Sequence, residues 1–269
     1  MRAPMKKNAI THRILCYIIA AFLLPAGCAP KVEPGGADST ESAAPVATAE
    51  ATVQTTSATV VNRDLLLDPA RTEDADSLLV GGYLYEGLVN TDDNGDIQPG
   101  IAFAWIVSDD ELDYIFEIRQ DARFSDGSPI TVDAIAENFN RWFEPKHPLH
   151  EDGNFPAWKK YFLGFNGERD ANNRAVSQID GVQKVDVNTF IVHLNRPEAQ
   201  LLNYLAEPSF AILSPAALAD NPDYGARQSA IVSSGQYVVT SWTDEGMTLS
   251  PNPLYWGSAG DGDLNFIWR

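Results

Sequence analysis

Residues 124–131, with the sequence FSDGSPIT, separate two segments whose apolar residues follow different periods. Before this stretch, Tyr114, Phe116 and Ile118 alternate with residues that include Glu117 and Arg119, which is typical of a half-buried β-strand. After it, residues 132–143 place their apolar side chains on one face of a helix, and Thr131 can cap that helix. Asp-Gly and Pro are turn residues. The sequence therefore predicts a strand, a tight turn and a helix that ends at Pro145.

The same two periodicities predict further hairpins and helices on both sides of this stretch. The expected hairpins join residues 103–107 to 114–119, 182–187 to 189–194, and 235–242 to 247–250. The expected helices cover residues 76–88, 199–205 and a short run after Ser214. Residues 266–268 are apolar and indicate one more strand. Hairpins that alternate with helices indicate an α/β or α+β class.

Composition and charge limit the partners. The chain has 269 residues, 44% of them hydrophobic, and a formal net charge of −18 from 37 acidic and 19 basic residues. Nucleic acids and anionic lipid surfaces are themselves negative, so binding to either is unfavourable. The composition favours a well-solvated globular protein that does not bind nucleic acid.

The N-terminus carries the features of an export signal. Residues 1–13 hold four positive charges, and residues 14–26 form an apolar run that is too short for a permanent membrane span. Ala26-Gly27-Cys28 resembles a bacterial lipobox, in which the signal is removed before a cysteine that is then acylated. We expect residues 1–28 to be a lipoprotein signal peptide with lipidation at Cys28. The alternative is an ordinary signal peptide in which Cys28 is incidental.

Residues 29–57 read as a disordered tether. They consist almost wholly of Ala, Thr, Ser, Pro, Glu and Gly, and they lack the apolar surface needed to offset the entropy of ordering. A protein attached to a membrane only through a lipid anchor would need such a linker. The remaining cysteine, Cys16, lies in the signal, so the folded body has no disulfide.

The sequence contains none of the common catalytic or phosphate-binding motifs. It lacks a phosphate loop, a dinucleotide fingerprint, a serine nucleophile elbow and a zinc-protease helix motif. We therefore predict a binding protein that is not an enzyme and that needs no cofactor.

Two acidic or histidine-containing loops invite a metal interpretation. Asp92, Asn94 and Asp96 resemble a calcium loop, but the Gly and Glu that such a loop requires are absent, so a turn is expected. His147 and His150 stand beside two carboxylates in a loop that contains proline. That loop is interpreted as solvated rather than metal-binding. His193 alternates with apolar residues in a strand and is interpreted as structural. No metal site is predicted.

Five motifs in a fixed order carry a resemblance to a known family. They are Leu67-Asp-Pro with YEGLV at 85–89, DIQPGIA at 96–102, ARFSDGSPIT at 122–131 after the strand at 114–119, SGQY at 234–237, and NPLYWG at 252–257. Together they resemble family 5 of the bacterial extracellular solute-binding proteins, the oligopeptide, dipeptide and nickel receptors of ABC importers.

The resemblance implies an α/β, periplasmic-binding-protein-like fold of type II. We expect a first lobe made of residues 58–91 and 185–269, with a small α+β domain inserted at 92–184. Family members continue well beyond the last motif into a second lobe that closes over the ligand. The resemblance therefore predicts that this chain is a truncated receptor whose second lobe is missing. It also predicts that the chain alone has no useful ligand affinity.

The resemblance also implies a function and candidate residues. A monomeric, lipid-anchored receptor on the outer face of the cytoplasmic membrane, in the periplasmic space, would capture peptides or related solutes and deliver them to an ABC permease. The ligand-binding candidates are Tyr85, Glu86, Gly235 and Tyr237; the alternative for Glu86 is an exposed carboxylate at a helix end. An exported scaffold or sensor module without a transport role is the second hypothesis, and a secreted hydrolase is the third.

Overall fold

The computed structural model describes residues 58–227 and 229–269, and within them the strands form three sheets. The expected signal segment with Cys28 and the expected tether lie outside the described residues. The strands are β1 (Ala58–Val61), β2 (Val89–Thr91), β3 (Ile97–Pro99), β4 (Ala102–Val107), β5 (Asp113–Ile118), β6 (Ile179–Lys184), β7 (Thr189–Leu194), β8 (Tyr237–Trp242), β9 (Gly246–Pro251) and β10 (Leu264–Trp268).

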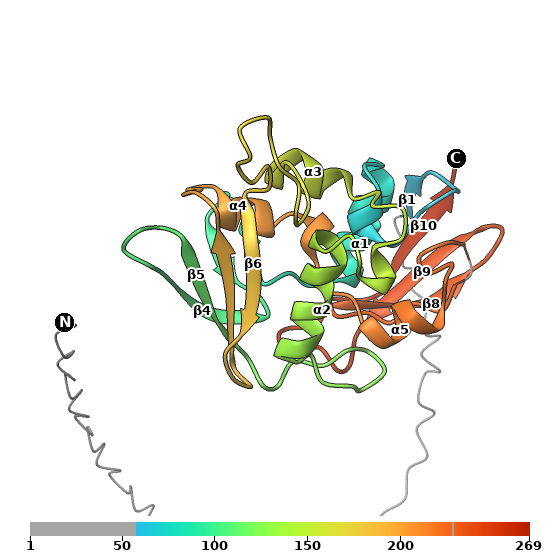
Figure 1. The fold of residues 1–269 in the computed structure, drawn as a ribbon. Helices are drawn as coiled ribbons and strands as arrows, with labels where there is room; N and C mark the ends of the chain where they lie inside the picture. Colours follow the sequence, from blue (N-terminus) through green and yellow to red (C-terminus); the bar gives the residue numbers. More distant parts are fainter. Residues whose placement is uncertain (1–57, 228) are drawn as a thin grey trace, which may run out of the picture. The chain divides into compact units, whose positions relative to one another are not determined.

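Helices and 3-10 turns connect these strands. The α-helices are α1 (Ala75–Leu84), α2 (Val132–Phe143), α3 (Pro156–Phe162), α4 (Leu201–Leu205) and α5 (Pro215–Asp220). The 3-10 turns are η1 (Pro69–Arg71), η2 (Pro148–His150) and η3 (Pro208–Phe210). In Figure 1, α2 lies between the strands β4 to β6 on one side and the strands β8 to β10 on the other.

Four antiparallel strands in the order β4-β5-β7-β6 form one sheet, which consists of two hairpins joined through β5 and β7. We call it the meander sheet as a label only, because its strands do not follow one another in sequence order. Both hairpins expected in this region are present, although β6 begins three residues before the predicted start. Phe116 on β5 faces Trp105 on β4 and Phe190 on β7. This row of aromatic side chains makes one face of the sheet strongly apolar.

Helix α2 packs against that apolar face, and its local sequence explains its bounds. The Thr131 hydroxyl accepts a hydrogen bond from the Ala134 amide at 3.1 Å, which caps the helix as predicted. Val132, Ile135 and Phe139 are all buried, so the expected apolar face is the one that packs. Helix α2 ends at Phe143, two residues before Pro145.

A second four-stranded sheet, in the order β1-β10-β9-β8, is here called the terminal sheet. The β8–β9 hairpin was predicted, and so was the strand at residues 266–268. The partner of that strand was not predicted: β10 pairs in parallel with β1, so that Val61 faces Trp268. Helix α1 lies beside this sheet and ends at Leu84, four residues before its predicted end.

The described residues bury two apolar clusters. The meander core holds the larger aromatic side chains, including Phe139, Trp142 and Trp158, and draws almost entirely on residues 88–212. The terminal core draws on two separate runs, residues 61–85 and 211–266. The sheet of the segment expected at 92–184 therefore extends to Leu194, and the expected boundary cuts the β6–β7 hairpin.

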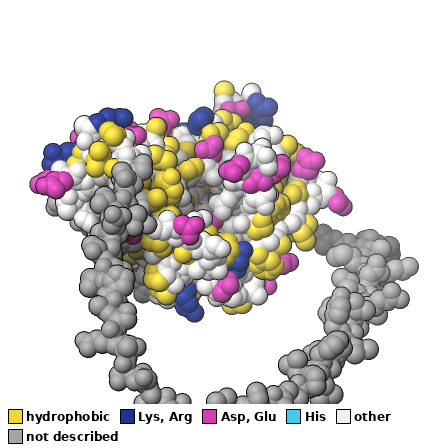
Figure 2. Space-filling model, turned by 180° about the vertical axis from the view of Figure 1, so that it is seen from behind, with side chains coloured by type: hydrophobic (Ala, Val, Ile, Leu, Met, Phe, Trp, Pro, Cys, Tyr) yellow, Lys and Arg dark blue, Asp and Glu magenta, His cyan; other side chains and the backbone are white. Residues whose placement is uncertain are grey.

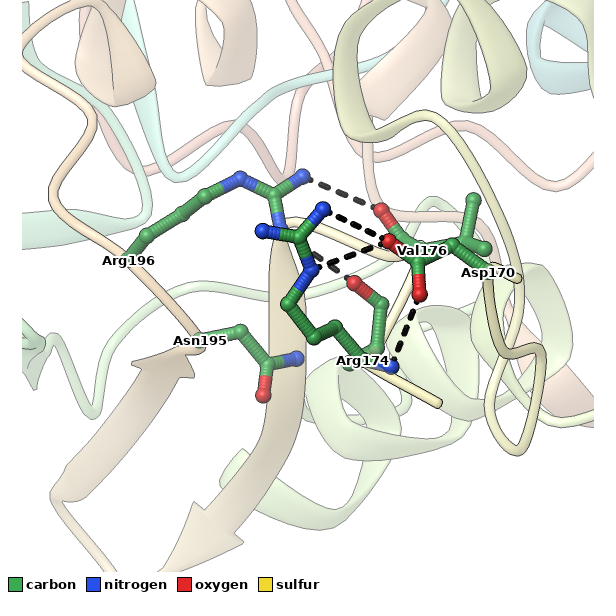
Figure 3. Close-up of a pocket in the computed structure, with 6 residues that line it drawn as sticks. Asp170, Arg174, Val176, Asn195 and Arg196 are labelled. Carbon is green, nitrogen blue, oxygen red and sulfur yellow. Dashed lines mark hydrogen bonds and ion pairs between the residues drawn. The ribbon is translucent and has the colours of Figure 1, made fainter. Parts of the chain in front are cut away.

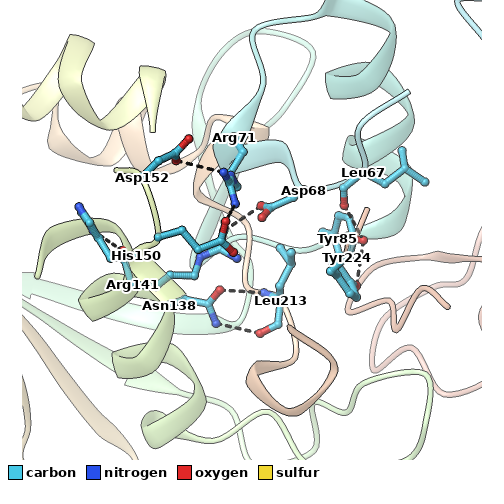
Figure 4. A network of polar contacts seen from close by, with 11 residues as sticks. Leu67, Asp68, Arg71, Tyr85, Asn138, Arg141, His150, Asp152, Leu213 and Tyr224 are labelled. Carbon is cyan, nitrogen blue, oxygen red and sulfur yellow. Dashed lines mark hydrogen bonds and ion pairs between the residues drawn. The ribbon is translucent and has the colours of Figure 1, made fainter. Parts of the chain in front are cut away.

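Buried polar contacts join the two cores (Figure 4). Arg141 on α2 donates to the Asp68 carboxylate at 2.8 Å, and both side chains are almost fully buried. The Asn138 side chain exchanges two hydrogen bonds with the backbone of Leu213. These groups hold α2 against the loops of the terminal core.

Candidate functional site

The candidate site begins where α1 ends. Asp74 caps the start of this helix, and its last turn closes when the Tyr85 amide donates to the Gly81 carbonyl. The chain then turns, and the Glu86 amide donates to the Ser234 hydroxyl at 3.0 Å. Backbone and side-chain contacts therefore hold Glu86 in place.

The Glu86 carboxylate is buried, with only 5% of the residue exposed, so the alternative of an exposed helix carboxylate is wrong. One carboxylate oxygen accepts a hydrogen bond from the Asn90 amide group, and the other accepts one from the Tyr255 hydroxyl at 2.8 Å. Burial raises the pKa of Glu86, because the charged form loses solvation, while these two donors act in the opposite direction. Burial and the Glu86 charge also raise the pKa of Tyr255.

A hollow of about 360 Å³ lies beside Glu86. The lining residues come from the end of α1, the segment around β2, the α4–η3 region and the start of β8. They are Gly82, Tyr85, Glu86, Gly87, Asn90, Thr91, Ala206, Glu207, Pro208, Ala211 and Gln236. The hollow is therefore formed by segments that are distant in sequence, and the polar residues that line it carry carboxylate, amide or hydroxyl groups.

Tyr85 lines this hollow, but its hydroxyl forms hydrogen bonds within the terminal core. The hydroxyl lies 2.9 Å from the Leu67 carbonyl oxygen and 3.0 Å from the Tyr224 hydroxyl, as Figure 4 shows. Burial raises the pKa of Tyr224 to about 12 and raises that of Tyr85 as well. Both phenols therefore remain neutral and act as structural hydrogen-bonding groups.

Gly235 and Tyr237 lie next to the hollow without lining it. A Cβ on Gly235 would come within 2.9 Å of the Leu84 and Tyr85 backbone, so glycine allows β8 to start close to the end of α1. The Tyr237 ring is buried and packs edge-on against Tyr83, with 5.7 Å between the ring centroids. The structure thus brings Tyr85 and Glu86 together at the hollow and places Gly235 and Tyr237 behind them.

The motif at 252–257 contributes a second layer behind Glu86. Tyr255 holds the carboxylate, and the guanidinium of Arg119 lies 3.5 Å from the centroid of the Trp256 ring. Arg119 also donates to the Gly100 carbonyl at 2.8 Å. Motifs that are separated by more than one hundred residues therefore meet around one carboxylate.

A larger hollow of about 530 Å³ lies at the far end of the meander sheet, between Asp170 and Arg196 (Figure 3). Its arginines already have partners. Arg174 pairs with the Asp170 carboxylate, and Arg196 donates to backbone carbonyls, including that of Val176 at 3.0 Å. Both guanidinium groups are engaged by the loop at residues 170–177, so this hollow is a weaker candidate than the one at Glu86.

The histidine loop differs from the expectation in one respect. His150 is buried, not solvated: its ring stacks edge-on against Phe165 and its Nδ1 lies 2.8 Å from the Arg141 carbonyl oxygen. His147 lies 2.9 Å from a Glu137 oxygen. Within the described part of the chain, no group of three or more His, Cys, Asp or Glu side chains could hold a metal ion.

The other two polar positions behave as structural elements. The Asp92 carboxylate accepts hydrogen bonds from the Asn94 and Asp96 amides, which makes the predicted turn. His193 on β7 lies 2.7 Å from Asp113 on β5, across the meander sheet. None of the helices within residues 58–227 and 229–269 combines the length and the apolar character that crossing a membrane requires.

Sequence reasoning identified only Tyr85 and Glu86 among the residues that line the hollow, and three of the polar residues that it missed are instructive. Asn90 lies four positions after Glu86 and could have been connected to it only if the turn after α1 were known. Gln236 lies in the middle of the SGQY motif, between Gly235 and Tyr237, which were both predicted to bind the ligand. Glu207 reaches the hollow only because η3 folds back onto α1, and no local pattern indicates this.

Comparisons with known proteins agree on one family. The family model described as "Bacterial extracellular solute-binding proteins, family 5 Middle" matches residues 96–265. The periplasmic murein peptide-binding protein MppA of Escherichia coli K12 is 27% identical over 197 residues, which cover 72% of this chain and 35% of that protein. The periplasmic oligopeptide-binding protein OppA of Salmonella typhimurium is 27% identical over 194 residues, again 72% of this chain and 35% of that protein.

Solved structures show the same fold. The periplasmic binding protein DppA from Helicobacter pylori, in complex with the peptide STSA, superposes with a TM-score of 0.65 at 22% identity. The match covers 79% of this chain and 43% of that one. The unliganded open form of MppA gives a TM-score of 0.62 at 24% identity, over 79% of this chain and 41% of that one.

Two expectations from the sequence are confirmed by these matches: the family, and the periplasmic-binding-protein-like fold of type II. The chain spans about 35% of the length of the curated relatives that it matches. Because the family model covers more than half of the chain, this protein belongs to the bacterial extracellular solute-binding proteins of family 5.

Proposed function

We propose that this chain belongs to the solute-binding component of a bacterial ABC importer, which captures peptides or related solutes outside the cytoplasm. The family match over residues 96–265 carries the proposal. The relatives MppA and OppA, which are named as peptide-binding proteins, support the choice of peptides as the solute class. The receptor itself would catalyse nothing, and the permease and its ATPase would supply transport.

The geometry around Glu86 supports a binding role for this region. A buried carboxylate in a fixed orientation, beside a polar hollow, is suited to recognise a ligand group rather than to react with it. We propose that Glu86 contacts the solute and that Tyr85, Gly235 and Tyr237 hold the end of α1 in the required position. Closure over the solute would complete the site in the intact receptor.

Membrane attachment forms a separate part of the proposal. Acylation at Cys28 would anchor the protein on the outer face of the cytoplasmic membrane, and residues 29–57 would tether the folded body to the anchor. Replacing this cysteine (Cys28→Ser) is expected to move the protein from the detergent phase to the aqueous phase in Triton X-114 partitioning. Unchanged partitioning of the variant would contradict the lipid anchor.

Peptide uptake tests the transport proposal. We expect a strain in which the gene is disrupted to lose uptake of a labelled pool of di- to pentapeptides, and a strain complemented with the intact gene to recover it. Unchanged uptake, together with co-purification of a sensor kinase, would instead favour the scaffold or sensor hypothesis.

A further inference from the structure

Strand β4 is an edge of the meander sheet, and its outward backbone groups have no partner among the described residues. Figure 1 shows β4 at the left of the molecule, with β5 beside it. The Ser108 amide donates to the Asp113 carbonyl, so these two residues form a hydrogen-bonded pair across the two strands. Such pairs alternate with non-bonded pairs in an antiparallel ladder. Trp105 and Val107 therefore direct their amide and carbonyl groups away from β5.

The sequence of β4 does not protect this edge. Residues 102–107, AFAWIV, contain no charged residue and no proline, which are the groups that commonly block an edge strand. Ile106 is 61% exposed and Phe103 is 48% exposed. A β-bulge interrupts the pairing with β5 only between Ala102 and Ala104, so the rest of the strand is regular. Strand β4 can therefore accept another strand.

The outer face of the meander sheet carries an apolar row that begins at this edge. Ile106 faces Ile115 on β5, which in turn faces Ile191 on β7. Phe116 and Phe190 are buried on the opposite face, so the three isoleucines point outwards. Single exposed apolar side chains are ordinary, and Figure 2 shows hydrophobic side chains at several places on the surface. A cross-strand row that ends at an open edge is more specific.

A second copy of the chain fits this edge because it continues the row. When two β4 strands lie antiparallel about a two-fold axis at Ile106, Trp105 of each copy is opposite Val107 of the other. These are the residues whose backbone groups point outwards, so they exchange hydrogen bonds. The two Ile106 side chains then meet, and the isoleucines of both copies form one continuous row.

The charges beside the strand favour the antiparallel orientation. The acidic turn at residues 109–111, DDE, follows β4. Arg119 lies at the start of β4, where its Nε donates to the Gly100 carbonyl at 2.8 Å. An antiparallel pair places the acidic turn of one copy beside Arg119 of the other. A parallel pair would bring the two acidic turns together, where like charges repel.

We propose that two copies of this chain associate through β4, by antiparallel pairing of these edge strands about a two-fold axis at Ile106. The inference goes beyond solute binding, because β4 contributes no residue to the Glu86 hollow. A contact between strands of six residues is small beside the standard interface of about 1,200–2,000 Å². The dimer is therefore weak and reversible, and the monomer expected from the sequence is its dissociated form.

Sedimentation equilibrium of the full chain tests the proposal. We expect a monomer–dimer equilibrium with a dissociation constant of about 10–500 μM. Ile106→Lys places two like charges at the axis and should weaken association about tenfold or more. Val107→Pro removes an outward amide without breaking a hydrogen bond to β5 and should have a similar effect. Leu163→Lys, at a position after α3 that is 56% exposed, makes the same charge change outside the sheet and should leave association unchanged.

Disulfide trapping locates the axis. In a background with Cys16→Ser and Cys28→Ser, Ile106→Cys provides a single thiol in each copy. The Cα atoms of a non-hydrogen-bonded antiparallel pair lie about 4.5 Å apart, which is within the range of a disulfide. We expect oxidised glutathione to convert Ile106→Cys into a covalent dimer at least about tenfold faster than Leu163→Cys in the same background. Equal rates would contradict an axis at Ile106.

Each remaining outcome also decides the question. A dimer that persists in both Ile106→Lys and Val107→Pro would overturn the proposal, and so would an equal loss in Leu163→Lys. Assembly beyond two copies would overturn it as well, because a two-fold contact closes after the second copy. Should Ile106→Lys fail to fold, Val107→Pro and the disulfide still test the contact. None of these measurements depends on solute uptake.

Discussion

The meander sheet and the terminal sheet are both four-stranded, but they are assembled differently. The meander sheet and its core draw almost entirely on residues 88–212, and the sheet consists of two hairpins that pair through β5 and β7. The terminal sheet joins β1 to β10, which are about 200 residues apart, and its core combines two separate runs. Each hairpin of the meander sheet is specified by neighbouring residues, and only the pairing of β5 with β7 joins distant segments. The terminal sheet additionally requires the two ends of the described chain to meet.

The cores differ in composition as well. Twelve aromatic side chains are buried in the meander core, among them Phe116, Trp142 and Phe190. The terminal core mixes aliphatic side chains with tyrosines whose hydroxyls need partners, such as Tyr85 and Tyr224. The comparison suggests that the meander core supplies most of the apolar driving force and that polar contacts orient the terminal core on it.

The largest expected effect comes from the ion pair that joins the two cores. Arg141→Met leaves the buried Asp68 carboxylate without its partner, and we expect a loss of about 3–5 kcal/mol in the free energy of unfolding. Urea denaturation measures this loss. The double variant Asp68→Leu with Arg141→Met removes both charges and should recover part of it. A double variant that is less stable than Arg141→Met would contradict this account of the pair.

Two glycines with positive φ, one near each core, allow the effect of close backbone packing at a turn to be tested. Gly225 has φ +84°, and a Cβ there would meet the Asp68 amide nitrogen at 2.5 Å, so Gly225→Ala should cost about 2–5 kcal/mol. Gly127 has a similar φ of +87° but open space around it, so Gly127→Ala should cost only about 1–2 kcal/mol. Equal losses in thermal unfolding would mean that close backbone packing does not distinguish the two turns.

Helix caps give a smaller test of the same comparison. Thr131 caps α2 beside the meander core, and Ser214 caps α5 near the terminal core. Replacing either with alanine should cost about 1 kcal/mol, because one amide at the helix start loses its acceptor. Urea denaturation of both variants measures it. A loss below about 0.3 kcal/mol at Thr131 would show that packing alone places the start of α2.

The smallest expected effect is a change with pH in the free energy of unfolding, caused by Glu86. Burial raises the pKa of Glu86 in the folded state above its ordinary value of 4.5, so the unfolded chain ionises first as pH rises. The free energy of unfolding therefore falls between pH 4.5 and the raised pKa, by about 1.4 kcal/mol for each pKa unit between the two states. Glu86→Gln cannot ionise and should not show this fall. Parallel curves for the two proteins between pH 4 and 8 would contradict the raised pKa.

The meander sheet and α2 were predictable because their signals are local. Alternation around Phe116, the turn at Gly127 and the cap at Thr131 each lie within a few residues of the structure that they specify. Where the sequence pattern is less regular, tertiary packing places the end of an element away from its predicted position. Helix α1 ends at Leu84 because the following residues turn toward Ser234 instead of continuing the helix.

The candidate site was predictable only in part. Glu86 could be identified from its motif, but its burial could not, because Asn90 and Tyr255 reach it through folds of the chain that no short pattern encodes. The burial of His150 was missed for the same reason. Its loop is polar in sequence, but the His150 ring packs against Phe165. The pairing of β1 with β10 also lacks a local signal, since both strands are short and their partners are remote.

The parallel pairing of β1 with β10 has a consequence for the order of events during synthesis. Ribosomes add about 5–20 residues per second, so β1 waits about 10–40 s before β10 has been made. Throughout that interval the strand that pairs with β1 in the described part of the chain has not been made, whereas the segments of the meander sheet are already present. The terminal sheet of the described chain consequently cannot be completed until residues 264–268 have left the ribosome. Any factor that must act on the unfolded chain has this interval in which to bind it.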